Sequence, residues 1–140
     1  MFKLDWKINK IKFLVYFLFS ITFVDLVHAS MPLVFIKNCY DGDTCTTRGG
    51  ERIRLACIDS PELRGRNSDY HSAMLARDFL NSLLANQEVS INRIAHDKYG
   101  RTVAELFKEK LNVQEFLVKK GHGKVYKSYA HQCDWTKHEQ

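Results

Sequence analysis

The chain has 140 residues, of which 45% are hydrophobic and 26% are charged. This length leaves room for one domain with a modest core and excludes a second domain. The formal net charge of +5 is mildly basic, so it permits a polyanionic partner without identifying one.

The N-terminal segment has the pattern of an export signal. Four lysines precede an apolar run over residues 13–24, and Val27-His28-Ala29 places small residues where a signal peptidase would cut. The run has about twelve residues, whereas a membrane-spanning helix needs roughly twenty. We therefore expect residues 1–29 to be a cleaved signal peptide and residues 30–140 to be a secreted or periplasmic domain. Asp25 and the bulky His28 depart from the pattern, and an uncleaved N-terminal anchor remains the alternative.

Three strands are predicted next, joined by tight turns. Residues 32–40 (PLVFIKNCY) and 44–48 (TCTTR) favour strands, and Asp41-Gly42 between them is a turn signal. Gly49-Gly50 marks a second turn, after which residues 52–58 (RIRLACI) read as the third strand.

The second half of the sequence mixes helices with two more strands. Apolar residues recur at helical spacing over residues 70–85, and strand character returns at 88–94 and 102–107. Asn112 followed by Glu115 resembles a capping box, which predicts a short helix over 113–120 that Gly121 ends. A last amphiphilic stretch, residues 124–135, is expected to start a further helix. This order predicts a mainly β, α+β fold: a small closed barrel of the OB type with about three helices.

The four cysteines all follow the predicted signal. Cys39 and Cys45 flank a turn, so a bridge across that hairpin is conceivable, while Cys57 lies in an apolar strand and is expected to be a buried thiol. Spacing alone does not fix the pairing. There is no Cys-x-x-Cys motif or Cys/His cluster, which argues against a zinc site.

Charged side chains stand at predicted strand ends, where a core does not need them. Asp41, Asp43, Asp59 and Glu62 could be brought together by the hairpins, and such a cluster needs a cation. Oxygen donors without His or Cys indicate Ca²⁺ or Mg²⁺. The alternative is a purely structural role for these residues: Asp41-Gly42-Asp43 would form a solvated turn, and the segment from Asp59 to Glu62 would cap a helix.

Two arginines add a second kind of group to these carboxylates. If Arg54 shares a sheet face with the carboxylates, its guanidinium could hold a phosphate through two parallel hydrogen bonds. Arg101 follows a polar loop, where an ordinary surface arginine is the alternative.

Three segments in this order carry a family resemblance: YDGDTC (40–45), RLACIDSPE (54–62) and DKYGR (97–101). Together they resemble the signature segments of the thermonuclease family, the staphylococcal nuclease-like enzymes, with a match in pattern from about Leu33 to Tyr129. The resemblance implies a five-stranded OB barrel with three helices. It also implies Ca²⁺-dependent hydrolysis of phosphodiester bonds in DNA and RNA, with 3′-phosphorylated products.

Carried over by position, the resemblance implies a metal site. Asp43 and Asp59 match calcium-binding carboxylates, and the backbone carbonyl of Ser60 matches a further ligand. Asp41 matches an acidic residue that is close to the metal without binding it directly.

The resemblance also implies catalytic and substrate-binding roles. Glu62 matches the general base for the attacking water, and Arg54 and Arg101 match the two catalytic arginines. Lys98 and Tyr99 match residues that contact a terminal phosphate of a bound nucleotide.

Stacking on nucleic-acid bases would come from the last segment. Tyr126 and Tyr129 are the candidates, because aromatic faces bind every base with little sequence preference, although a core role for Tyr126 is an open alternative. Beyond the predicted signal, the five histidines at positions 71, 96, 122, 131 and 138 show no metal-ligand spacing and are assigned no role.

The sequence also departs from the family pattern. Family members generally continue well beyond the position of Trp135 with a charged helix, whereas five residues follow it here, and the loop after Glu62 differs in length.

Two function classes therefore stand: an exported, monomeric Ca²⁺-dependent nuclease with no stable protein partner, and a non-catalytic barrel that binds nucleic acid or protein. The joint presence of the carboxylates and arginines favours the nuclease, because a binding module has no need of carboxylates that repel phosphate.

Overall fold

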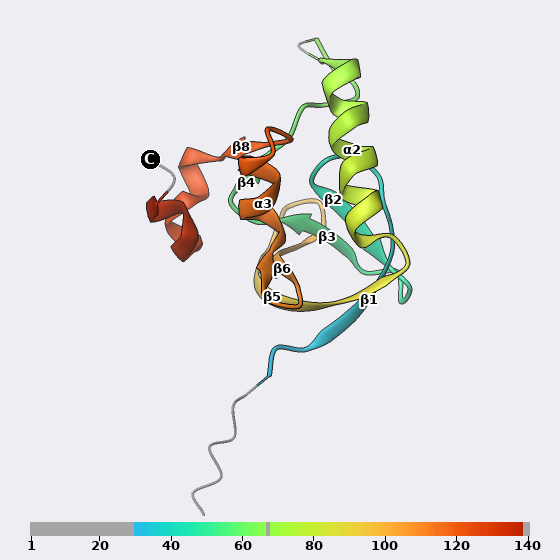
Figure 1. Ribbon diagram of the computed structural model, residues 1–140, viewed down its shortest axis with the longest axis vertical. Coiled ribbons are helices and arrows are strands. Elements are labelled where there is room, and N and C mark those ends of the chain that lie inside the picture. Colours follow the sequence, from blue (N-terminus) through green and yellow to red (C-terminus); the bar gives the residue numbers. More distant parts are fainter. Residues whose placement is uncertain (1–29, 67, 139–140) are drawn as a thin grey trace, which may run out of the picture. The chain divides into compact units, whose positions relative to one another are not determined.

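The computed structural model describes residues 30–66 and 68–138. The predicted signal peptide lies outside the described residues. Within them the elements follow one another in the order expected of a mainly β domain (Figure 1). The strands are β1 (Leu33–Cys39), β2 (Thr44–Thr47), β3 (Arg52–Leu55), β4 (Ile58–Asp59), β5 (Gln87–His96), β6 (Thr102–Lys108), β7 (Leu111–Asn112) and β8 (Lys124–Val125). The helices are α2 (Tyr70–Leu84) and α3 (Val113–Lys119), followed by the 3₁₀ turns η1 (Lys127–Gln132) and η2 (Asp134–His138).

Five strands close into a mixed barrel. The hydrogen-bonded order β3-β2-β1-β5-β6 is antiparallel, and a parallel pairing of β3 with β6 joins the two ends. Its interior is filled by alternate side chains of the strands, such as Ile53 and Leu55 of β3, which are almost fully buried. The predicted barrel and its mainly β class are confirmed.

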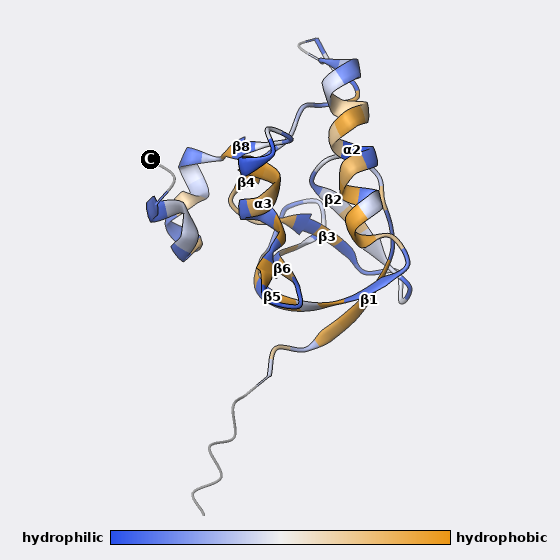
Figure 2. Ribbon diagram, in the orientation of Figure 1, coloured by the Kyte–Doolittle hydropathy of each residue, from blue (hydrophilic) through white to orange (hydrophobic). Residues whose placement is uncertain are grey.

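The α2 helix covers the barrel beside β1 and β5 (Figure 1). Ala76, Leu80 and Leu84 are fully buried. Figure 2 shows hydrophobic and hydrophilic positions interleaved along α2. Asp69 caps its first turn by accepting a hydrogen bond from the Ser72 N–H at 3.1 Å.

A side chain of α2 also holds the end of β1. Asn81 exchanges two hydrogen bonds of 2.8 Å with the backbone N–H and carbonyl of Cys39. These bonds anchor the end of β1, and so the start of the loop that follows it, to α2.

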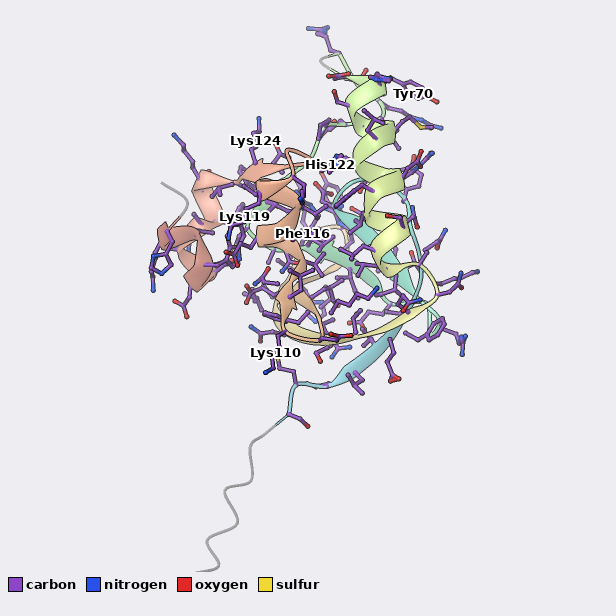
Figure 3. The ribbon with its side chains drawn as sticks, in the orientation of Figure 1. Tyr70, Lys110, Phe116, Lys119, His122 and Lys124 are labelled. Carbon is purple, nitrogen blue, oxygen red and sulfur yellow. A yellow bond between two sulfur atoms is a disulfide. The ribbon has the colours of Figure 1, made fainter. Side chains whose placement is uncertain are left out.

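The α3 helix begins where the capping signal predicts. The Asn112 side chain accepts from the N–H groups of Gln114 and Glu115, and Lys120 and Gly121 end the helix. Glu115 pairs with Lys119 rather than returning to Asn112. Figure 3 shows His122 just beyond this helix, where its ring stacks on Phe79 of α2 with a centroid distance of 4.3 Å.

The third predicted strand is shorter than expected. Residues 52–58 do not form one strand: β3 ends at Leu55, and Cys57 adopts the left-handed conformation (φ 64°) that turns the chain toward β4. The helices predicted over 70–85 and 113–120 are confirmed, while the C-terminal stretch that was expected to start a third helix forms β8 and the 3₁₀ turns η1 and η2.

The prediction of a free Cys57 thiol is wrong, because Cys57 is bonded to Cys133. The left-handed turn at Cys57 interrupts the expected strand, and the disulfide joins this turn to Cys133, which lies between η1 and η2. The second disulfide joins Cys39 and Cys45, opposed residues of the β1–β2 hairpin, as the turn between them allowed.

An ion pair stabilises the seam where the barrel closes. Glu51 accepts hydrogen bonds from Arg93 Nε (2.9 Å) and Nη2 (2.6 Å) and from the Thr102 hydroxyl (2.8 Å). The Arg93 hydrogen bonds lower the pKa of Glu51 below its ordinary value of 4.5, against the opposing effect of burial and with help from Thr102. The folded state thus favours the ionised carboxylate.

This lowered pKa predicts a pH-dependent effect of Glu51→Gln. Because the folded pKa is below the unfolded one, the stabilisation is present above about pH 4.5 and is lost as pH falls through the folded pKa. We expect the variant to lose about 1 kcal/mol of unfolding free energy at pH 7 and less at pH 3, measured by urea titration. Glu88→Gln, at an exposed position of β5, removes the same charge and should change little. A loss from Glu51→Gln that is the same at both pH values would contradict this account.

In the part of the chain that the structure describes, no helix combines the length and apolar character needed to cross a bilayer.

Candidate active site

The loop between β1 and β2 is built to present Asp43. The Asp41 carboxylate accepts a hydrogen bond from the Asp43 N–H (3.0 Å), and the Tyr40 N–H donates to the Thr44 carbonyl (2.8 Å). A Cβ at Gly42 would lie 2.8 Å from Cβ atoms of both Ala76 and Ser60. Glycine is therefore required for the loop to approach α2 and the Ser60 segment this closely.

Asp43 is a buried carboxylate with a full set of donors. Its Oδ2 accepts from the Ser60 N–H (3.0 Å) and hydroxyl (2.9 Å), and its Oδ1 accepts from the Thr44 hydroxyl (3.2 Å). Burial raises the pKa of Asp43 above its ordinary value, and Asp41 adds to the rise, while Arg54 opposes it. A carboxylate whose charge is disfavoured in this way gains from any further cation nearby.

Arg54 brings Asp43 and Asp59 together. Its Nη2 lies 3.2 Å from Asp43 Oδ2 and 3.9 Å from Asp59 Oδ1. Arg52 and Arg54 alternate with buried Ile53 and Leu55, so both point out of the barrel, with Arg54 the more buried of the two.

The same guanidinium also stabilises the turn after β3. Arg54 Nη1 donates to the Leu55 carbonyl (2.8 Å), and Nη2 donates to the Ile58 carbonyl (2.9 Å). A substitution of Arg54 would therefore reduce the stability of the fold as well as any catalytic activity. The sequence alone had indicated only the catalytic role.

Asp59 is the more open of the two carboxylates. It lies on the short β4, which pairs with β8 so that Asp59 faces Lys124, and its side chain is 39% exposed. Lys124 Nζ is 3.8 Å from Asp59 Oδ2, and Figure 3 shows Lys124 extending from β8 at the edge of the fold.

Arg101 is held from two sides. Its Nε donates to Asp97 Oδ2 (2.6 Å), and its Nη1 donates to the Thr44 hydroxyl (3.3 Å). Burial acts to raise the pKa of Asp97, but hydrogen bonds from Arg101 and from the Tyr99 N–H outweigh it and lower that pKa. Asp97 is therefore an ionised partner that fixes the Arg101 guanidinium.

All eleven residues singled out in the sequence line one open cavity of about 950 Å³. They are Asp41, Asp43, Arg54, Asp59, Ser60, Glu62, Lys98, Tyr99, Arg101, Tyr126 and Tyr129. Glu62 is exposed, and none of the residues that the structure describes forms a hydrogen bond with its carboxylate. The carboxylates and guanidinium groups thus face the same space, as a phosphate-binding site requires.

Five polar or charged cavity residues were given no role by sequence reasoning: Tyr40, Arg64, His96, Asp97 and Gln132. The Asp97-to-Arg101 spacing within one tight loop was a usable signal, since the carboxylate can reach both the backbone and the side chain four residues later. The sequence around Gln132 contains no comparable pattern, because the position of this residue depends on the disulfide that joins the C-terminal segment to Cys57.

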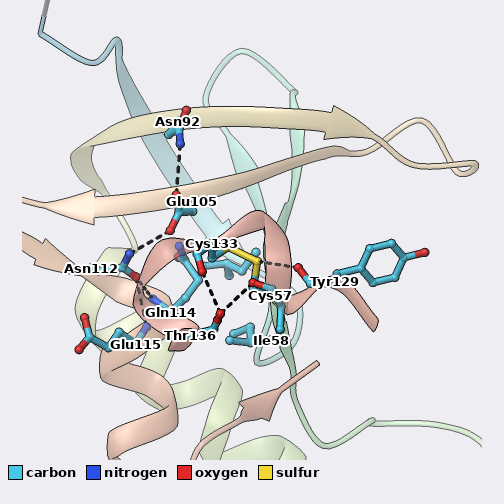
Figure 4. The surroundings of a disulfide bond; sticks show 12 residues. Cys57, Ile58, Asn92, Glu105, Asn112, Gln114, Glu115, Tyr129, Cys133 and Thr136 are labelled. Carbon is cyan, nitrogen blue, oxygen red and sulfur yellow. Dashed lines mark hydrogen bonds between the residues drawn. A yellow bond between two sulfur atoms is a disulfide. The ribbon is translucent and has the colours of Figure 1, made fainter. Parts of the chain in front are cut away.

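The aromatic wall of the cavity is attached to the barrel through a disulfide (Figure 4). Tyr126 donates its N–H to the Cys57 carbonyl (2.8 Å), and the Tyr129 carbonyl lies 3.3 Å from the Cys57 sulfur. The Tyr126 and Tyr129 rings meet edge to face with centroids 5.2 Å apart, and they are 42% and 49% exposed. Tyr126 is therefore a surface residue, not the core residue that was the alternative.

The donor set suits a hard cation. Asp43, Asp59 and the Ser60 carbonyl supply oxygen atoms only, and the Asp43 charge is buried, so an ion such as Ca²⁺ fits the chemistry. Among the described residues no three His, Cys, Asp or Glu side chains are grouped closely enough to hold a metal by themselves. An ion here would therefore need oxygen ligands from water or substrate as well.

Comparison with known proteins decides the family. The sequence model of the family described as "Staphylococcal nuclease homologue" matches residues 52–140, which include most of the cavity-lining residues. The chain belongs to the staphylococcal nuclease homologue family.

Several curated relatives of this family member carry nuclease names. The chain is 34% identical over 93 residues to an "Uncharacterized endonuclease" of Escherichia coli O157:H7, covering 64% of this chain and 58% of the relative. A protein of the same description from Haemophilus influenzae is 34% identical over 95 residues, covering 65% and 51%. A "Probable staphylococcal-like nuclease" of Oryza sativa subsp. japonica is 30% identical over 107 residues, covering 74% and 26%. The chain thus spans between a quarter and three fifths of the length of these relatives.

Proposed function

We propose that this protein is an exported, Ca²⁺-dependent nuclease that hydrolyses phosphodiester bonds in DNA and RNA without sequence preference and leaves 3′-phosphorylated products. The observation that carries the proposal is the convergence of Arg54, Arg101, Asp43, Asp59 and Glu62 on one cavity. Family membership and the names of the relatives support it.

The proposed chemistry depends on charge neutralisation. A phosphodiester is an anion that repels nucleophiles, and negative charge builds on its oxygens as water attacks. Arg54 reaches the cavity from β3 and Arg101 from the residue just before β6, and preorganised groups of this kind often supply the largest catalytic term. A Ca²⁺ ion held by Asp43, Asp59 and the Ser60 carbonyl would add positive charge at the same phosphate.

Glu62 is the proposed general base. Its exposed carboxylate has no hydrogen-bond partner among the described residues, so it is available to accept a proton from water. Pro61 precedes it and limits the backbone conformations of the short segment from Asp59.

The substrate would lie along the aromatic and basic rim. Tyr99 is 65% exposed, and the Lys98 ammonium and the Arg101 guanidinium lie 5.1 Å and 5.6 Å from the centre of its ring. Together with Tyr126 and Tyr129, which line the same cavity, this rim offers stacking and phosphate contacts that do not depend on base identity.

A chelation experiment tests the proposal. We expect the purified full chain to cleave DNA and RNA, to stop when a chelator removes divalent ions, and to recover with Ca²⁺. Binding without cleavage under all metal conditions would favour the non-catalytic barrel instead. Phosphatase-sensitive 3′ ends on the products would identify the bond that is broken.

Asp43→Asn tests the proposed metal ligand. We expect weaker metal binding and a loss of turnover that added Ca²⁺ partly restores, measured as activity against Ca²⁺ concentration. Asp134→Asn removes an equal charge from an exposed position in η2 and should leave the Ca²⁺ dependence unchanged. Failure of Ca²⁺ to restore any activity at any concentration would speak against direct ligation by Asp43.

A further inference from the structure

We propose that Thr44 is a positioning residue that joins the metal-side carboxylate to the Arg101 guanidinium, an inference that rests on the proposed nuclease function. Thr44 is the first residue of β2 and does not line the cavity. Its side chain is buried, with 5% of the residue exposed.

The Thr44 hydroxyl has a donor role and an acceptor role at once. It donates its hydrogen to Asp43 Oδ1 at 3.2 Å and accepts from Arg101 Nη1 at 3.3 Å. Because one oxygen atom makes both contacts, the distance between Asp43 and Arg101 is set through Thr44.

This bridge completes a continuous chain of hydrogen bonds. Ser60 donates to Asp43 on one side of Thr44, and Arg101 donates to Asp97 on the other. Arg101 sits immediately before β6 and Thr44 opens β2, two strands that are not neighbours in the barrel. The link therefore spans β3, which lies between β2 and β6. Within β3, Arg54 is paired with Thr44 of β2 on one side and with Val103 of β6 on the other.

The arrangement leaves the reactive side of Arg101 open. Asp97 takes Nε and Thr44 takes one hydrogen of Nη1, and no group in the described part of the chain accepts from Nη2. The remaining N–H groups of Arg101, a residue that lines the cavity, are thus presented to a phosphate in a fixed orientation.

Thr44→Val tests the bridge, because valine keeps the shape of the side chain and removes the hydroxyl. We expect turnover to fall about tenfold with a smaller change in KM, because orientation and not binding is lost. Thr44→Ser keeps the hydroxyl and should retain turnover within about threefold.

A double-mutant cycle separates positioning from general damage. If Thr44 acts through Arg101, Thr44→Val should cost little additional turnover in an Arg101→Ala background. Additive losses would overturn the proposal. Urea midpoints of all variants show whether a loss of activity reflects unfolding.

A second measurement does not depend on catalysis. Rotation about the Arg101 Nε–Cζ bond exchanges its two Nη groups, and NMR line shapes of the guanidinium hydrogens report its rate. We expect Thr44→Val to speed this rotation several-fold and Thr44→Ser to leave it near the wild-type rate. An unchanged rate in Thr44→Val overturns the proposal even if the protein is a nuclease. A faster rate supports the bridge even if the wild-type chain cleaves no nucleic acid, in which case only the proposed function fails.

Discussion

Replacing Arg101 with alanine should lower the rate of DNA cleavage by about 10²- to 10³-fold, the usual cost of removing one preorganised donor from a developing oxyanion. The guanidinium is fixed by Asp97 and Thr44, so little reorganisation is needed when charge builds on the phosphate. Stopped assays at saturating Ca²⁺ and DNA measure the turnover directly. Arg101→Lys keeps the charge without the planar fork and should recover only part of the rate.

Arg93→Ala is the matched control for this prediction. Like Arg101, Arg93 is paired with a carboxylate, but it lies on β5, pairs with Glu51 at the seam and does not line the cavity. We expect its loss to reduce stability modestly and to leave turnover near the wild-type value. Similar activity losses in the two alanine variants would show that the Arg101 effect is structural and would remove Arg101 from the proposed chemistry.

Removing the Cys57–Cys133 disulfide by changing both residues to serine should cause the largest loss of stability. The bond closes a sequence separation of 76 residues, for which loop-closure entropy predicts about 4–5 kcal/mol. Small domains have roughly 5–15 kcal/mol in total, so this variant should be close to unfolding at room temperature. Urea titration measures the loss. Where the variant remains folded, KM should rise, because the segment that carries Tyr126 and Tyr129 loses its covalent link to Cys57 and is held only by the β4–β8 pairing and backbone hydrogen bonds.

The other disulfide supplies the comparison. Cys39 and Cys45 are separated by six positions, and their bridge should contribute only about 2 kcal/mol by the same relation. It also closes the loop that carries Asp43, so its loss should reduce turnover more than it affects substrate binding. Equal stability losses from the two pairs would contradict the entropic account.

The barrel and most of the cavity residues could be predicted because local signals agree with the fold. Alternation in RIRL places Ile53 and Leu55 inside and Arg54 outside, and Asn112 caps α3 where its sequence neighbours indicate. The three signature segments then identified side chains that the barrel brings to one cavity. Their chemical roles are still predictions.

The parts that could not be predicted depend on long-range contacts. Cys57 was expected to be a thiol because an apolar strand was drawn through it, whereas its left-handed turn is stabilised by Arg54 hydrogen bonds and by a partner 76 positions away. The bridge through Thr44 needs the relative placement of β2 and the loop before β6, which no local pattern encodes. Gln132 lines the cavity next to Cys133, whose disulfide partner is 76 positions away in the sequence.

The parallel pairing of β3 with β6 has a consequence for how activity reports on the folded population. Arg54 lies opposite Val103 in this pairing, two residues from Arg101, so both guanidinium groups are brought together by the last ladder that closes the sheet. A molecule that opens along this ladder alone would keep α2 and α3 and yet separate the two cations. Cleavage would then cease at lower denaturant than helical circular dichroism is lost, and the assay would count only chains whose sheet is closed.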